Sequence, residues 1–166
     1  MKTIVKMLLV ILIMGGTFFG VKPAYAGDDG SDEPSEEEYL GFVSTSEGID
    51  GVTQQLPGGG SAYAQAQIGW AVLRVDGIAK TSLSSGVTGT FSICAKADEV
   101  FKDGTSMGGV GQICASKTGG GSVKSTKKVF TAPFGHLWQV DTEHSVTAAG
   151  FNWYPTNTLS TFIPWP

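Results

Sequence analysis

The stretch "GHLWQVDTEHSV", residues 135–146, gathers the side chains best suited to proton transfer or metal binding: His136, Asp141, Glu143 and His144. Histidine and carboxylate groups act as general acids and bases, and three convergent ones can hold a catalytic metal ion with one open position. If the stretch is one strand, however, alternation places His144 on the apolar face and both carboxylates on the opposite face. We therefore predict a core histidine hydrogen-bonded to backbone, whereas a turn at residues 141–144 would let the groups converge.

A second set of residues follows the order of a hydrolase triad. "GTSMG" matches the Gly-x-Ser-x-Gly pattern around Ser106, and Asp141 and His144 come later in the chain. That pattern needs a buried strand turning sharply into a helix, but here it adjoins Asp103 and Gly104 in an expected hairpin loop. A hydrolase that uses Ser106 and His144, or a metal ion at His136–His144, is thus the secondary hypothesis, and the favoured reading is no enzyme. We expect no metal, because strand alternation opposes convergence of the ligands. We expect no nucleotide cofactor either, because the glycine stretches lack the lysine and following helix of a phosphate loop.

Aromatic residues are concentrated in "FNWYPTNTLSTFIPWP", residues 151–166. Aromatic faces in such loops and edges are typical of sugar-binding sandwiches, so Trp153, Tyr154 and Trp165 are the candidate binding residues. The alternative is packing, because alternation would direct Phe151 and Trp153 to the core and leave Trp165 to cover the chain end.

The first residues indicate export. Lys2 and Lys6 precede an apolar run, and Ala24-Tyr25-Ala26 supplies a small-residue cleavage site, so we predict a signal peptide at residues 1–26. The run is shorter than the roughly 20 residues of a spanning helix, which disfavours a membrane anchor. We expect a secreted protein, extracellular or periplasmic, with no membrane span after cleavage.

Charge is distributed unevenly. The formal net charge is −4, and cleavage would remove three of eleven basic residues and none of fifteen acidic ones, which leaves −7. Seven acidic residues lie in "GDDGSDEPSEEE" without a base among them, and the body carries eight charges of each sign. We predict a flexible acidic leader at residues 27–60 and no nucleic-acid partner, because the body lacks a basic surface.

The two cysteines, Cys94 and Cys114, are expected to form a disulfide in an oxidising compartment. The strand at residues 86–97 alternates, with Phe91 and Ile93 on one side and Cys94 on the other. Pairing it with residues 109–116 around a turn at Asp103-Gly104 would place the cysteines opposite each other. The hairpin and the disulfide support each other.

The remaining body, residues 61–166, reads as short strands punctuated by glycine. In residues 61–75, Ala62, Ala64, Ala66, Ile68, Trp70 and Val72 share one face. Asp76-Gly77 predicts a hairpin turn with a returning strand at residues 78–82. The lysines of residues 122–132 suit an exposed sheet edge. We predict an all-β fold, an antiparallel β-sandwich of immunoglobulin-like type, with a small β-barrel as the alternative.

The order at the end of the chain, "GHLWQVDTEHSVTAAG" followed by a shorter last strand, resembles the penultimate and last strands of immunoglobulin-like bacterial secreted domains. The resemblance covers about thirty residues and implies no function. The expected function rests instead on the signal peptide, the neutral strand-rich body and the aromatic residues at the end of the chain. These features favour a secreted binding domain that acts on a cell-envelope, polysaccharide or protein surface. A secreted toxin or bacteriocin-like effector is the alternative.

Overall fold

The computed structural model describes residues 39–45 and 51–166, which consist of β-strands and their connections. The predicted signal peptide, residues 1–26, and the acidic run of residues 27–38 lie outside the described residues. Among the residues described, no helix has the length and apolar character needed to cross a bilayer. In chain order the strands are β1 (Gly41–Ser44), β2 (Val52–Gln55), β3 (Ser61–Ala71), β4 (Arg74–Leu83), β5 (Thr90–Lys102), β6 (Thr105–Ser106), β7 (Ile113–Thr118), β8 (Gly121–Val129), β9 (His136–Ala148), β10 (Phe151–Trp153) and β11 (Thr156–Ile163).

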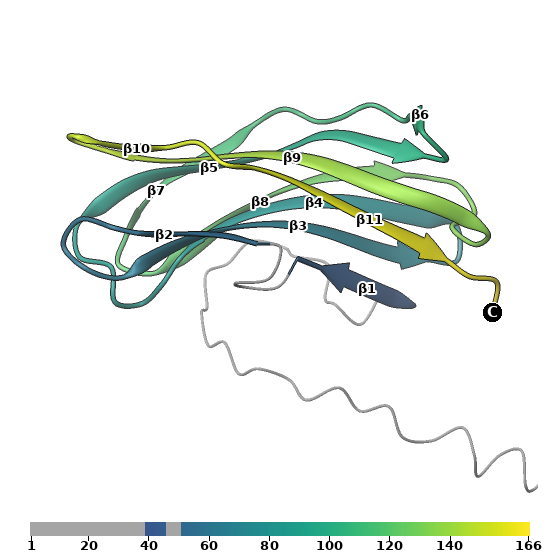
Figure 1. The fold of residues 1–166 in the computed structure, drawn as a ribbon, viewed down its shortest axis with the longest axis horizontal. Helices are drawn as coiled ribbons and strands as arrows, with labels where there is room; N and C mark the ends of the chain where they lie inside the picture. The colour runs from purple at the N-terminus through teal and green to yellow at the C-terminus, as the bar shows by residue number, and fades with distance from the viewer. Residues whose placement is uncertain (1–38, 46–50) are drawn as a thin grey trace, which may run out of the picture. The chain divides into compact units, whose positions relative to one another are not determined.

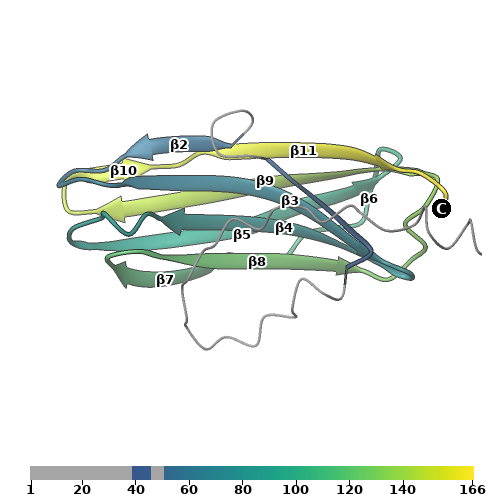
Figure 2. The same cartoon turned by 90° about the horizontal axis from the view of Figure 1, so that it is seen from below.

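These strands form two antiparallel sheets packed face to face (Figure 1, Figure 2). In the first, here the β4 sheet, β4 lies between β3 and β8, and β1 and β2 both pair with β3. In the second, the β9 sheet, β9 pairs with β5, β10 and β11, and β5 also pairs with β6 and β7. The sheets are separate, so the predicted antiparallel sandwich is confirmed and the closed barrel is wrong.

The strand order is immunoglobulin-like. The β4 sheet runs β3-β4-β8 and the β9 sheet runs β11-β9-β5-β7, which corresponds to strands A-B-E and G-F-C-C′. In this order β9 and β11 hold the positions of the penultimate and last strands. The disulfide differs from the immunoglobulin pattern, since it joins β5 to β7 within one sheet.

The alternation predicted for the first long strand is confirmed, since Ala62, Ala64, Ala66 and Ile68 are all buried on one face of β3. The predicted turn at Asp76-Gly77 is wrong, because both residues lie within β4 and the turn is formed by Val72 and Leu73. Asp76 is fully buried and ion-paired with Arg74, Nε to Oδ1 3.1 Å. Gly77 allows close packing of the sheets, because a Cβ there would lie 2.4 Å from Cγ2 of Val100.

The second predicted hairpin is confirmed together with its disulfide. Asp103 and Gly104 connect β5 to β6 with positive φ angles of 50° and 77°, the conformation that favours Asp-Gly in two-residue turns. Beyond this turn the chain returns as β7, in which Cys114 lies directly opposite Cys94. The two sulfur atoms are bonded, and the Cα atoms are 4.1 Å apart.

Two strands come from residues 27–60, the range predicted as the leader. β1 and β2 pair with opposite halves of β3, so both strands belong to the β4 sheet. The Tyr39 ring lies against Gly69, and its hydroxyl donates to Oδ2 of Asp76 at 2.6 Å. Both strands form because the edge of β3 is available for pairing. The residue pattern within 41–55 contains no information about that edge.

The core lies between the sheets, and its largest fully buried side chain is Trp138, which donates its Nε1 hydrogen to the Pro133 carbonyl at 2.9 Å. Both sheets contribute aliphatic side chains to this core, including Val75 of β4 and Val140 of β9. The lysine-bearing strand β8 lies at the edge of its sheet, as predicted.

Replacing both Cys94 and Cys114 by alanine is expected to lower the free energy of unfolding by about 3 kcal/mol, because the bridge closes a loop in the unfolded chain. Urea denaturation of parent and variant without reductant measures the difference. Dithiothreitol should destabilise the parent by a similar amount and leave the variant unchanged. Equal stability of the two proteins without reductant would contradict the structural role of the bridge.

Candidate functional site

The stretch that carries the two histidines forms a single strand, β9, and its side chains alternate as predicted. His144 is 3% exposed and faces the β4 sheet, whereas Asp141 and Glu143 lie on the outer face of the β9 sheet. The turn that would have brought these groups together does not form. The prediction of a core histidine is confirmed.

The partners of His144 are hydroxyl groups and not the expected backbone. Its Nδ1 lies 2.8 Å from Oγ1 of Thr81 on β4, and its Nε2 lies 2.8 Å from Oγ1 of Thr142. The Thr81 hydroxyl donates to the Cys94 carbonyl at 2.6 Å, so it accepts from a protonated Nδ1. The neutral ring then accepts at Nε2 from Thr142, whose hydroxyl also lies 3.2 Å from the Asn157 carbonyl.

This environment keeps the imidazole neutral. Burial lowers the pKa of His144 from 6.5 to about 4, because a charged ring between the sheets would lose its hydration. Both ring nitrogens are engaged within the core. The side chain therefore links the two sheets and is not available to exchange protons with a bound substrate.

The other triad candidates lie apart from His144. Ser106 is exposed on β6 and donates to Glu99, and Asp141 accepts hydrogen bonds from Gln139 at 3.0 Å and Thr158 at 2.8 Å. Serine, aspartate and histidine thus have separate partners in separate places. The structure does not assemble the triad that the sequence order suggested.

His136 also has a structural partner. Its Nδ1 lies 2.7 Å from Oδ2 of Asp103, while Oδ1 of Asp103 accepts the Leu137 amide at 2.9 Å. The backbone hydrogen bond from Leu137, and then His136, lower the pKa of Asp103. The pair fastens the β5–β6 turn to the start of β9. Among the residues described, no three His, Cys, Asp or Glu side chains come close enough together to hold a metal ion.

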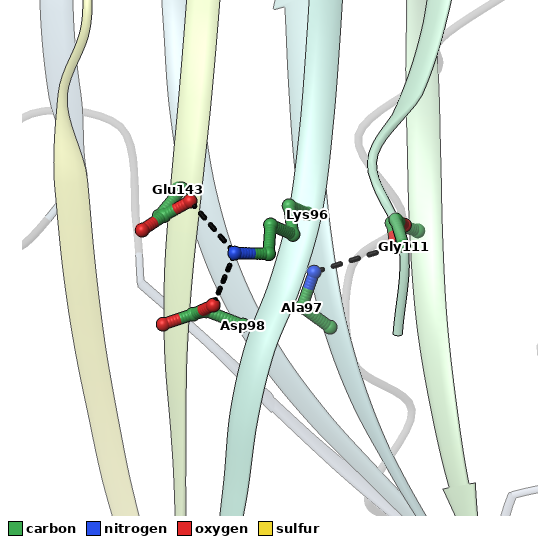
Figure 3. Close-up of polar contacts among 6 residues, drawn as sticks. Lys96, Ala97, Asp98, Gly111 and Glu143 are labelled. Atoms are coloured by element: carbon green, nitrogen blue, oxygen red, sulfur yellow. Dashed lines mark hydrogen bonds and ion pairs between the residues drawn. The ribbon is translucent and has the colours of Figure 1, made fainter. Parts of the chain in front are cut away.

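The outer face of the β9 sheet carries an ion-pair cluster. Lys96 reaches Glu143 at 3.0 Å and also pairs with Asp98, as Figure 3 shows. Asp98 lies where the β5–β9 register shifts between Ala97 and Glu99, and as the second residue after Lys96 on β5 it lies on the same side of the strand. Asp98 and then Glu143 raise the pKa of Lys96. The cluster pairs one ammonium group with two carboxylates, so all three of its charged side chains have a partner.

The structure separates the three predicted binding residues. Trp153 on β10 is half-buried and packs against the core, whereas the neighbouring Tyr154 is 68% exposed. Trp165 is 71% exposed, and it follows β11 whereas Tyr154 precedes it. The eight residues of β11 span about 26 Å at 3.3 Å each, so these aromatic groups do not form one platform.

Trp165 instead belongs to a group of exposed apolar side chains at one end of the sandwich. The turn between β3 and β4, the connection from β8 to β9 and the chain after β11 all lie at this end, toward which β8 and β11 point in Figure 2. We call the following exposed residues the apolar end: Leu40, Phe42, Val72, Leu73, Phe130, Leu137, Phe162 and Trp165.

Several of these residues are linked by cross-strand pairing, ring contacts or backbone hydrogen bonds within their own sheet. Leu137 and Phe162 are direct cross-strand partners, and the ring of Trp165 lies 6.3 Å from that of Phe134. On the β4 sheet, the Leu40 amide bonds to the Trp70 carbonyl beside the Val72–Leu73 turn. Phe130 is 77% exposed and directly follows Val129, the partner of Val75.

The adjacent apolar residues Val72 and Leu73 are the sequence feature that indicates the apolar end. Placing the turn at Asp76-Gly77 assigned Val72 to a buried strand face, whereas Val72 and Leu73 occupy the turn itself. Apolar residues at a turn, in place of polar ones, are the feature that marks this end.

The sequence and the structure were compared with those of known proteins. A scan against protein-family models and searches of curated proteins and of solved structures found no match to this chain.

Replacing His144 by glutamine is expected to change how stability depends on pH. The unfolded chain takes up a proton near pH 6.5 and the folded chain only near pH 4, so the parent loses stability as pH falls through this interval. The His144 contribution to that loss is about 3 kcal/mol. Urea denaturation of both proteins at pH 7 and pH 4 isolates it, because the carboxylates are common to both. Identical pH dependence would contradict a neutral buried His144.

Proposed function

We propose that this chain is a secreted, non-catalytic binding domain that attaches to a surface of the cell envelope through its apolar end. The observation that carries the proposal is the gathering of eight exposed large apolar residues at one end of the sandwich. Single exposed apolar residues are ordinary on soluble proteins, whereas a group of them marks an interaction surface.

The environment of Trp165 favours recognition through preformed contacts. Its ring lies against Phe134 and over Gly135, where a Cβ would come within 2.4 Å of the indole Nε1. Gly135 has a φ of 75°, so the same position needs glycine for backbone reasons as well. A side chain held in this way loses little conformational entropy on binding, which strengthens attachment.

Binding is favoured over catalysis because the groups best suited to chemistry serve the fold. His144 links the sheets, His136 fastens a turn, and Lys96 forms ion pairs with two carboxylates.

Secretion is favoured by the cysteines. The chain's two cysteines form the Cys94–Cys114 bridge, which is the state expected outside the reducing cytosol. The signal peptide inferred for residues 1–26 agrees with this compartment.

Retention on isolated peptidoglycan, on insoluble glycans and on whole bacterial cells tests the proposal, with the chain from Gly27 to Pro166 as the parent. A Phe162→Ser, Trp165→Ala double variant is expected to lose roughly tenfold or more in affinity, because it removes two exposed apolar groups from the contact.

A matched control comes from the same chain. Ile113 is 49% exposed and Tyr154 68% exposed, and both lie away from the apolar end. An Ile113→Ser, Tyr154→Ala variant should be retained like the parent. Equal retention of the two variants, or no retention of the parent on any envelope material, would contradict the proposal.

A further inference from the structure

Three lysines lie near the ends of strands that finish at the apolar end. Lys127 and Lys128 lie in the last three residues of β8, and Lys102 ends β5. Both strands end on the side of the domain that carries the β3–β4 turn and the C-terminus. Cationic groups and exposed apolar groups therefore occur together.

The acidic side chains near this end are already engaged. Asp76 is fully buried and bonded to Tyr39 and Arg74, and Asp103 is bonded to His136 and the Leu137 amide. The other acidic side chains among the described residues lie farther along the β9 sheet: Asp98, Glu99, Asp141 and Glu143. Asp103 remains negatively charged beside Lys102, so the positive excess at this end comes from Lys127 and Lys128, here called the positive rim.

We propose that the partner of the apolar end is a lipid bilayer with anionic headgroups, an inference that rests on the function proposed above. The Val72–Leu73 turn and Phe130 enter the interface between headgroups and acyl chains. Trp165 lies at the headgroup level, which indole rings prefer. Lys127 and Lys128 contact the negative headgroups.

The chemistry of the end favours lipid over a glycan. Val72 and Leu73 offer neither hydrogen bonds nor an aromatic face to a sugar, and they form the tip of a turn that is exposed by 63% and 67%. Projecting aliphatic tips beside lysines match a fluid interface, where apolar burial and attraction to anionic lipid act together.

The test is sedimentation of the chain from Gly27 to Pro166 with vesicles of phosphatidylglycerol and phosphatidylethanolamine, and with vesicles of phosphatidylcholine alone. The parent is expected to bind the anionic vesicles and to bind phosphatidylcholine more weakly. A Leu73→Ser, Phe130→Ser variant should partition roughly tenfold or more weakly, because two apolar side chains leave the interface. The Ile113→Ser, Tyr154→Ala variant should partition like the parent.

Charge is tested separately. A Lys127→Gln, Lys128→Gln variant should bind the anionic vesicles more weakly than the parent and bind phosphatidylcholine equally. Added salt should weaken the parent more than this variant. Equal salt dependence of the two proteins would overturn the role of the positive rim.

Tryptophan fluorescence gives the depth of contact. Acyl chains brominated near the headgroup should quench the parent on binding, and a Trp165→Phe variant should lose most of that quenching, since Trp138 is fully buried and Trp70 and Trp153 are partly buried. Quenching that survives in Trp165→Phe would overturn the assigned orientation.

The outcomes separate this inference from the function on which it rests. No binding of the parent to anionic vesicles overturns the lipid assignment. If peptidoglycan, glycan or whole cells still retain the parent but not the Phe162→Ser, Trp165→Ala variant, the envelope-binding function stands and its partner is not lipid. Equal partitioning of the Leu73→Ser, Phe130→Ser variant and its control overturns the inference as well.

Discussion

The hydrogen-bonded group formed by Thr81, His144 and Thr142 is the constraint on which the arrangement of the two sheets depends. It crosses the core from β4 to β9, and Thr81 extends it to the Cys94 carbonyl on β5. A buried imidazole without partners is costly, so a shift of one sheet against the other would leave polar groups unsatisfied. Apolar packing alone tolerates such shifts more easily. The histidine therefore fixes the position of one sheet relative to the other. Burial in the core keeps its imidazole neutral.

This constraint also explains why the chemistry-bearing residues do not form a site. Strand alternation directs His144 inward and Asp141 and Glu143 outward, and each group then finds a partner on its own side. The turns at one end are not subject to the same demand, since the core is complete without them. The apolar residues in those turns are exposed and bury little surface in the core, which is the physical reason to connect them with binding.

Features that depend on neighbouring residues could be predicted from the sequence. The inward position of His144 follows from the period of β9, and the pairing of Cys94 with Cys114 follows from their nearly equal distances to the Asp103–Gly104 turn. The turn predicted at Asp76-Gly77 was wrong because this dipeptide has other roles within β4. Asp76 forms a buried ion pair, and Gly77 allows the two sheets to approach closely. The β1 and β2 pairings, and the collection of distant turns into the apolar end, depend on tertiary contacts that no local pattern contains.

Hydrogen exchange of the chain from Gly27 to Pro166, measured with and without isolated cell envelopes, tests most directly whether the apolar end is the working surface. The account predicts slower exchange on binding in peptides that cover residues 71–74, 130–137 and 162–166. Exchange in the middle of the β9 sheet, residues 94–98 and 139–145, should remain unchanged. Protection confined to that sheet, with none at the three end segments, would contradict the account.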